Sequence, residues 1–536
     1  MLTSGLRYGK QILSRSFRGK PQIRSLGALR PKSGSDYRHY KNAFGLFAVS
    51  SVVLAGITVF SPLVLNDNPR VVSKKELSTH STEDDCWISI NGKVYDLSGF
   101  ARKHPGGTNP ILKYAGSDAS RIFNSLHAPG LIATALTPDL VVGEYLDSGD
   151  ETTDLEELEK QESMSNKPPL SRIFNLNDFE KVARQVLSEY ALAYYATGSD
   201  DEVTLGENHN AYHRVFFKPR VLVNVAQIDT STSLLGTPTS VPFYVSAAAR
   251  AKLGHEDGEL AIAKGAGRED VIQMISTVAS YPLDEITAVA RPGQSQWFQL
   301  YVNADPEHTR SLMEKFNNTA CLKGLFITVD TACLGNRETD RRGHFEELSF
   351  PVDDEGFPVR NVANSVASSL MDTGLVWDDI ARFRAMTSKP IVLKGIQCVD
   401  DVLKAIDAGV DGVVLSNHGG RNLDFSPPPL QVLADLQPVL KEKGLEGKIE
   451  IFIDGGVRRG TDILKALCLG ATGVGLGRPF LYSVSGYGEA GVVKAIQILK
   501  DELEISMRLL GVTKISDLTP EHVDVRQLRV AEAGKL

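Results

Sequence analysis

Eight short apolar segments recur between residues 243 and 476, and this repeat constrains the fold more than any other feature of the chain. Most are separated by stretches with the composition and length of helices, such as 258–267, 400–409 and 461–470. Parallel strands that are buried on both faces have such apolar runs, and each needs a crossover before the next strand. We predict eight parallel strands at 243–247, 271–275, 297–302, 325–329, 391–394, 412–415, 449–453 and 473–476.

The regular repeat favours a closed (β/α)8 barrel of the TIM type, and an open doubly wound sheet is the alternative. A barrel makes a further demand, because its catalytic groups lie at the carboxyl ends of strands and its phosphate site follows strands seven and eight. Glycine-rich turns follow both of those strands, at 454–460 and 475–479. Backbone N–H groups at a helix start, together with Arg458 and Arg478, suit a phosphate. The sequence therefore predicts an α/β barrel with a phosphate site.

The sixth strand ends in Ser416-Asn-His-Gly-Gly-Arg421, which places an imidazole and a guanidinium together. His418 can take a proton near neutral pH, and Arg421 can hold a carboxylate through two parallel hydrogen bonds. A base beside a carboxylate clamp suggests chemistry at the carbon next to a carboxylate. Asp330, after the fourth strand, could orient His418 and stabilise its charged form. A satisfied polar histidine without a catalytic role is the alternative.

Five separated motifs carry a family resemblance: TVDTACLGNRETD, LKGIQ, LSNHGGR, DGGVRRG and GLGRP. Together they resemble the FMN-dependent 2-hydroxy acid dehydrogenase and oxidase family over residues 171–525. The resemblance implies that His418 is the base, that Asp330 supports it, and that Tyr301 bonds the substrate oxygen. It implies that the substrate carboxylate is held by Arg421, Arg337 and Tyr194. The implied FMN site comprises Ala248, Ala249, Ser276, Gln299, Thr328, Lys394, Asp454, Gly455, Gly456, Arg458, Gly477 and Arg478.

Two departures from the family pattern lie close to this predicted site. The family usually has a proline shortly after the aspartate of the fourth strand, where this chain has Ala332. After the first strand the chain reads Ser-Ala-Ala-Ala-Arg250, where relatives typically carry a threonine and an apolar residue. Arg250 could perturb the flavin potential or point away from it. Ala249 and Val278 are expected near the pocket and indicate a substrate with a short side chain.

A second module is predicted at 71–147. Two short strands, 87–90 and 93–95, flank an Asn91-Gly92 turn, a strong hairpin signal. A His-Pro-Gly-Gly motif contains His104, and His127 follows 23 residues later. Two imidazoles across an apolar crevice are what a six-coordinate haem iron needs. The module resembles the cytochrome b5 family, which implies haem b with His104 and His127 as axial ligands and one-electron transfer as its task.

Residues 1–70 read as a targeting region. Residues 1–42 contain ten Lys/Arg and one acid, which is typical of a mitochondrial targeting peptide, although a disordered basic arm has the same composition. Residues 43–65 contain no charged side chain and are long enough to span a bilayer of about 30 Å. This order is similar to the two-part presequence of intermembrane-space proteins. We expect the mitochondrial intermembrane space, with membrane attachment only if 43–65 is not cleaved.

The remaining segments indicate little about function. Residues 148–170 are predicted to be an acidic linker, either a hinge or an inert spacer, and 526–536 a C-terminal tail. Because the net charge is −8 despite the basic first 42 residues, the body is acidic and does not suggest nucleic acid. The five cysteines are odd in number and scattered, so we expect buried free thiols.

The order of the modules is similar to that of the haem-containing, FMN-dependent L-lactate dehydrogenases that reduce cytochrome c. The resemblance implies that FMN oxidises a small L-2-hydroxy acid such as L-lactate. Electrons would then pass singly through haem b to cytochrome c, and the protein would be a homotetramer. A 2-hydroxy acid oxidase that reduces oxygen and a haem and flavin redox sensor without turnover remain the alternatives.

Overall fold

The computed structural model describes residues 70–104, 108–126, 132, 136–146, 164–344 and 371–528. The predicted targeting region 1–70 lies outside these residues apart from its last position, as do most of the linker and of the C-terminal tail. No helix in the described ranges is both long and apolar enough to cross a membrane.

The module at 71–146 is built on a five-stranded sheet with the order β1-β5-β4-β3-β2. The predicted hairpin is confirmed, since Asn91 and Gly92 take φ values of 53° and 78° between β3 and β4. These positive angles give the turn the twist of its two strands. The strands are β1 Val71–Ser73, β2 Ser81–Thr82, β3 Asp85–Ile90, β4 Lys93–Asp96 and β5 Val141–Leu146. The helices are α1 Lys74–Leu77, η1 Ala101–Lys103, α2 Asn109–Lys113, α3 Ser120–Leu126 and η2 Pro138–Leu140.

The larger module is a closed barrel of eight parallel strands, as predicted from the apolar repeat. Chain order runs around the barrel from β10 to β16, and β9 closes it between β16 and β10. The predicted second strand starts two residues early, because Val271 and Ile272 are buried without belonging to the ladder. The strands are β9 Phe243–Val245, β10 Gln273–Ser276, β11 Gln296–Leu300, β12 Leu322–Thr328, β13 Ile391–Ile396, β14 Gly412–Leu415, β15 Glu450–Asp454 and β16 Gly473–Leu476.

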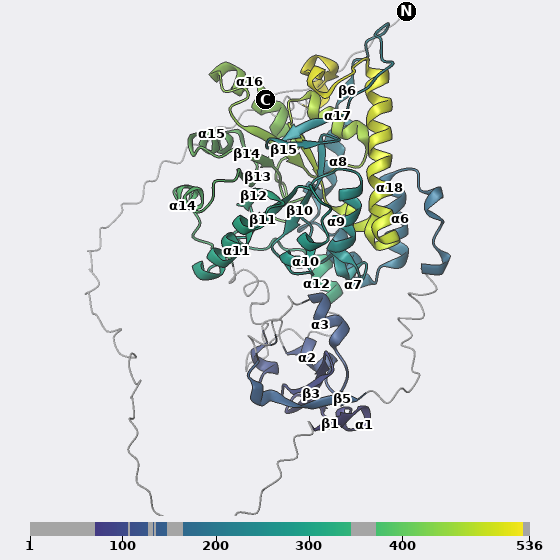
Figure 1. The fold of residues 1–536 in the computed structure, drawn as a ribbon, viewed down its shortest axis with the longest axis vertical. Coiled ribbons are helices and arrows are strands. Elements are labelled where there is room, and N and C mark those ends of the chain that lie inside the picture. Colours follow the sequence, from purple (N-terminus) through teal and green to yellow (C-terminus); the bar gives the residue numbers. More distant parts are fainter. Residues whose placement is uncertain are drawn as a thin grey trace, which may run out of the picture. The chain divides into compact units, whose positions relative to one another are not determined.

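Helices surround the barrel, and the last of them, α18 (Arg478–Leu510), runs along its outside beside α6 and α9 (Figure 1). The three helices predicted at 258–267, 400–409 and 461–470 are confirmed as α9, α15 and α17. The other elements precede the barrel, connect its strands or follow it. The helices are α6 Leu176–Val186, α7 Glu189–Ala196, α8 Val203–His213, α9 Gly258–Arg268, α10 Leu283–Ala288, α11 Pro306–Asn318, α12 Glu338–His344, α14 Asp379–Met386, α15 Val399–Asp407, α16 Pro429–Lys443 and α17 Gly460–Cys468. The short elements are η3 Leu170–Arg172, β6 Phe216–Phe217, β7 Thr232–Leu234, β8 Thr237–Thr239, η4 Ala251–Leu253, η5 Ile515–Asp517, η6 Pro520–His522 and β17 Val523–Asp524.

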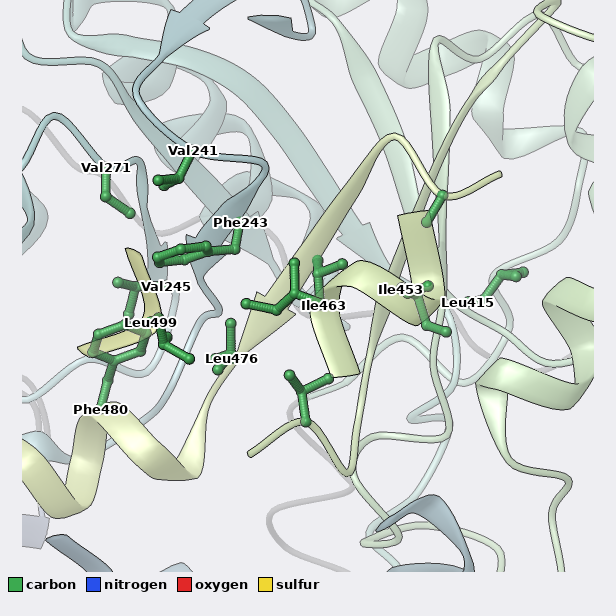
Figure 2. Packing of buried hydrophobic residues seen from close by; sticks show 14 of the residues in the cluster. Val241, Phe243, Val245, Val271, Leu415, Ile453, Ile463, Leu476, Phe480 and Leu499 are labelled. Atoms are coloured by element: carbon green, nitrogen blue, oxygen red, sulfur yellow. The ribbon is translucent and has the colours of Figure 1, made fainter. Parts of the chain in front are cut away.

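Alternate residues of the strands pack into two separate hydrophobic cores. On β9, Phe243 and Val245 belong to the large cluster between strands and helices, which also contains Leu499 and Phe480 of α18 (Figure 2). Tyr244, between them, belongs to a second cluster that includes Trp297 and Phe452 from other strands. Side chains alternate across a strand, so the second cluster fills the barrel interior. The barrel interior is therefore a packed core, and a ligand can bind only at the ends of the barrel.

All five cysteines are free thiols, as expected, but not all are buried. Cys86 and Cys468 are buried, Cys321 is intermediate, and Cys333 and Cys398 are exposed. The prediction of buried thiols is therefore wrong for Cys333 and Cys398. Both follow barrel strands in loops, where the apolar neighbours that signal burial in the sequence no longer pack around the side chain.

Candidate active site

Four consecutive barrel strands end in buried polar side chains that form one row. The Ser276 hydroxyl, at the end of β10, donates to Gln299 Oε1 at 3.1 Å. The Gln299 amide, on β11, donates to Thr328 Oγ1 at 2.8 Å. Lys394, on β13, is 5% exposed, and its Nζ lies 3.9 Å from Asp454 Oδ2. Because the strands are parallel, these groups meet at the carboxyl end of the barrel, as the sequence predicted.

The turn after β14 requires three successive residues with positive φ: His418 at 59°, Gly419 at 64° and Gly420 at 77°. A Cβ on Gly420 would lie 2.6 Å from the Leu205 nitrogen, so only glycine fits there. The Ser416 hydroxyl accepts a hydrogen bond from the His418 N–H at 3.1 Å. The turn thereby holds the imidazole in place at the strand end.

The His418 ring lies between an acid and a phenol. Its Nδ1 is 2.9 Å from Asp330 Oδ1, and its Nε2 is 3.2 Å from the Tyr301 hydroxyl. A carboxylate accepts only, so Nδ1 carries the proton and donates to Asp330, which leaves the Nε2 lone pair toward the cavity. Burial raises the pKa of the Tyr301 hydroxyl, which therefore stays protonated near neutral pH.

Opposing effects act on this pair of titrating groups. Burial, followed by the nearby Lys394, lowers the pKa of His418, although Asp330 acts in the other direction. Burial by itself would raise the pKa of Asp330, but His418 and Lys394 hold it at about 2. Near neutral pH, His418 is therefore neutral and Asp330 is ionised, which is the state that a general base needs.

Two predicted substrate-binding guanidinium groups lie over the phenol ring of a third predicted residue, Tyr194. The guanidinium of Arg421 lies 5.1 Å from the Tyr194 ring centroid and that of Arg337 lies 5.7 Å from it. Arg421 donates to the Tyr194 carbonyl at 2.8 Å, and Arg337 pairs with Asp340 at 3.3 Å. Burial and the neighbouring Arg337 lower the pKa of Arg421 to about 9. Two enclosed cations so close together form a strong site for a carboxylate.

The predicted phosphate loops are in place at the starts of α17 and α18, although their hydrogen bonds differ from expectation. Gly455 and Gly456 take φ values of 96° and 79°. The amides of Arg458 and Arg459 both donate to Asp462 at 3.0 Å, so these amides serve the loop itself. Because these two amides are already hydrogen-bonded, the candidate phosphate contacts are the side chain of Arg458 and the turn at Gly477.

Arg478 acts as a brace between segments. Its guanidinium donates to the carbonyls of Tyr195, Thr197 and Gly419 at 2.9, 2.8 and 2.9 Å. The brace joins the end of α7 to the catalytic turn. A role of Arg478 toward phosphate, implied by the family resemblance, stays a prediction.

The donor set fits FMN. The buried row of hydroxyl and amide groups matches the polar edge of a flavin ring, and the buried Lys394 can stabilise negative charge on the reduced ring. Ala248 and Ala249, after β9, line the same cavity as Gly477 and Arg458. Small side chains there leave room for a planar ring.

In the smaller module, His104 ends η1 and lines a cavity with apolar walls. Its ring centroid lies 6.0 Å from that of Phe100 in an edge-to-face arrangement. These surroundings fit a haem, whose macrocycle is apolar and whose iron takes an imidazole. His127, the predicted second ligand, lies outside the described residues. The module's walls are Ile88, Ile90, Leu97, Phe100, Ile111 and Phe123.

Comparison with known proteins identifies both modules. Residues 183–525 match the family model of FMN-dependent dehydrogenases. The chain belongs to the FMN-dependent dehydrogenase family. Residues 73–146 match the cytochrome b5-like haem/steroid binding domain, so this FMN-dependent dehydrogenase carries a haem module. The cofactors FMN and haem, predicted from the sequence, are confirmed by these two families.

Two curated relatives are similar to this FMN-dependent dehydrogenase over most of its length. It is 55% identical to the L-lactate dehydrogenase (cytochrome) of Wickerhamomyces anomalus, over 86% of this chain and 80% of that one. It is 44% identical to the Saccharomyces cerevisiae L-lactate dehydrogenase (cytochrome), over 96% and 92%. A mutant flavocytochrome b2 with pyruvate bound matches with a TM-score of 0.66 and 50% identity, over 71% and 93%. The predicted resemblance to the haem-containing, FMN-dependent L-lactate dehydrogenases is confirmed.

Several polar residues that organise this dehydrogenase site were not predicted. Asn208 of α8 and Asn417 exchange hydrogen bonds of 2.7 and 2.8 Å, which joins a helix outside the repeat to the catalytic turn. Glu259 of α9 accepts from the amides of Ala251 and Ser280 at 2.9 Å and so holds two flavin-side loops. Asn417 lies inside a recognised motif, whereas Asn208 and Glu259 have no sequence signal of their own.

Proposed function

We propose that the protein oxidises L-lactate, or a similarly small L-2-hydroxy acid, to the 2-keto acid and passes the electrons through haem b to cytochrome c. The observation that carries the proposal is the neutral His418, held by Asp330, beside the two guanidinium groups of Arg337 and Arg421. A base and a carboxylate clamp in one pocket suit a 2-hydroxy acid.

Each residue has a distinct task in this reaction. Arg337 and Arg421 bind the carboxylate and orient the α carbon toward the flavin. His418 Nε2 accepts a proton from the substrate, and Asp330 stabilises the imidazolium that results. The Tyr301 hydroxyl donates a hydrogen bond to the substrate oxygen. When bound, FMN accepts two electrons from the substrate, and haem carries them one at a time.

Stopped-flow spectroscopy of the holoenzyme tests this proposal. On mixing with L-lactate, the flavin absorbance should bleach first and the haem bands should then sharpen, with cytochrome c reduced in steady state. Haem that stays oxidised while oxygen is consumed would favour the oxidase. Flavin that is reduced without any turnover would favour the redox sensor.

Assembly and location belong to the same proposal. We place the mature protein in the mitochondrial intermembrane space on the basis of the basic segment 1–42 and the apolar segment 43–65. The homotetramer is proposed from the family resemblance alone. N-terminal sequencing of the mature protein and its mass in solution test both parts. A mature start before residue 43 would contradict a soluble form.

The pH profile of kcat/KM should follow the ionisation of His418. Only the neutral imidazole accepts a proton, and burial and Lys394 lower the pKa of His418 below its ordinary 6.5. Activity should therefore be constant near neutral pH and fall only as the pH drops through that lowered pKa. Lys394→Met removes a positive charge, so the acid limb should move to higher pH.

The measurement is kcat/KM for L-lactate from about pH 5 to about pH 8 with a flavin-directed electron acceptor. Lys404→Met, which changes a lysine that is 56% exposed on α15, is the matched control and should leave the limb in place. An acid limb that stays where it was in Lys394→Met would show that His418 is not the titrating group.

A further inference from the structure

Arg250 is an unusual cation in the candidate substrate pocket. It follows β9 directly, and its backbone takes a φ of 58°, a conformation uncommon outside glycine. The Tyr195 hydroxyl donates to the Arg250 carbonyl at 2.8 Å, which holds this main-chain conformation. The side chain lines the same cavity as Tyr194 and Arg421.

The Arg250 guanidinium lies on the substrate side of the cavity. It is 5.2 Å from the Tyr194 ring centroid, so three guanidinium groups now surround a single phenol ring. Burial has the largest effect on the pKa of Arg250 and lowers it, whereas the nearby Tyr194, Tyr190 and Asp340 raise it. None of these three residues belongs to the strand-end row assigned to the flavin. The sequence left open whether Arg250 acts on the flavin or points away from it. The structure shows that it points away from the flavin row.

Arg250 has no ion-pair partner among the described residues. Asp340 forms its ion pair with Arg337, at 3.3 Å. Tyr190 lies near Arg250, but burial raises the pKa of Tyr190 to about 12, so the phenol is neutral. Among the residues for which the structure gives positions, no carboxylate oxygen lies within 4.0 Å of the Arg250 guanidinium.

A monocarboxylate also leaves this charge unmatched. Among the described residues around the Tyr194 ring, Asp340 pairs with one of the three guanidinium groups, and one substrate carboxylate would pair with a second. A second carboxylate on the substrate would complete the balance in an enclosed pocket, where pairing charges is worth most. Ala248 and Ala249, adjacent in sequence to Arg250, line the same cavity and leave space for a short substituent.

We propose that Arg250 is a specificity-determining residue that recognises a second carboxylate, so that the pocket accepts short 2-hydroxy dicarboxylic acids. This inference rests on the proposed function and extends its substrate class. L-malate is the simplest probe. Arg337 and Arg421 hold the carboxylate next to the reacting carbon, and Arg250 pairs with the distal one. L-malate loses the hydrogen of its α carbon and its hydroxyl proton, two electrons pass to FMN, and oxaloacetate is the product.

The test compares kcat/KM for L-malate and L-lactate in the full-length holoenzyme with a flavin-directed acceptor. Wild type should oxidise both acids. Arg250→Leu should lower the malate-to-lactate ratio of kcat/KM by at least about tenfold, because a buried charge-assisted contact is lost. Arg250→Lys should retain more of the ratio than Arg250→Leu. Arg310→Leu, at a site 58% exposed on α11, is the matched control and should keep the wild-type ratio.

Equilibrium binding gives a readout that does not depend on turnover. Isothermal titration with oxaloacetate and pyruvate should show that Arg250→Leu weakens oxaloacetate binding by about tenfold more than pyruvate binding. Arg250→Gln serves as a second variant if Arg250→Leu is insoluble, and flavin absorbance reports whether each variant is loaded.

The outcomes separate this inference from the proposed function. If lactate is oxidised but malate is not, or if the ratio is unchanged in Arg250→Leu, the inference is overturned and the proposed function stands. Slower haem reduction with an unchanged ratio would assign Arg250 to electron transfer and also overturn the inference. If neither acid reduces the flavin, the proposed function fails and the inference fails with it.

Discussion

Replacing His418 with Gln should lower kcat for L-lactate by on the order of 10²–10⁴-fold, the range for loss of a general base. Glutamine can hydrogen-bond to Asp330 and Tyr301, but it cannot take a proton near neutral pH. The substrate carboxylate still meets Arg337 and Arg421, so KM should change much less than kcat. Steady-state kinetics with cytochrome c, together with flavin absorbance to verify loading, measures both.

The control for this variant is His308→Gln, an exposed histidine on α11 that should keep full activity. A loss of less than about tenfold in His418→Gln would show that another group accepts the proton. A parallel loss of FMN would instead show that His418 shapes the cofactor site. Both results would contradict the assignment of His418 as the base.

Trp297→Ala should destabilise the barrel by about 3–5 kcal/mol, the usual cost of truncating a buried tryptophan. Trp297 is fully buried in the barrel interior. Its ring centroid lies 4.9 Å from that of Tyr244, 4.7 Å from Phe326 and 5.6 Å from Phe452. These four aromatic rings come from separate strands, so the cavity cannot close without moving the barrel wall.

Urea unfolding followed by circular dichroism measures this effect as a lower midpoint of the barrel transition. Phe174→Ala, at a position 74% exposed, is the matched aromatic control and should change stability by less than about 0.5 kcal/mol. An unchanged midpoint in Trp297→Ala would mean that the interior aromatic cluster contributes little to the barrel.

Much of the fold was predictable because its signals are local. Each barrel strand is a run of apolar residues, and several strands carry a functional group at or close to their carboxyl ends. Ser276, Thr328 and His418 were therefore placed correctly at strand ends. The strand limits differ by a few residues, as at Val271, since hydrophobic burial continues past the hydrogen-bonded ladder.

Other parts of the site could not be predicted because they depend on distant segments. Asn208 and Asn417 are 209 positions apart in the chain, and neither belongs to a periodic sequence pattern that would predict the contact. The Arg478 guanidinium donates to three backbone carbonyls that only the folded chain brings near. The exposure of Cys333 and Cys398 is likewise a property of loops.

The sequence by itself determined that the chain has two modules and that the larger one is an eight-stranded barrel. It also determined which residues lie at the strand ends, because apolar spacing and short motifs are local and repeat. Only the tertiary structure decided where charges face one another. It placed Asp340 against Arg337, and it placed Arg250 over Tyr194 with no ion-pair partner among the described residues. Electrostatic pairing depends on distances between groups far apart in the chain, and no linear pattern encodes those distances.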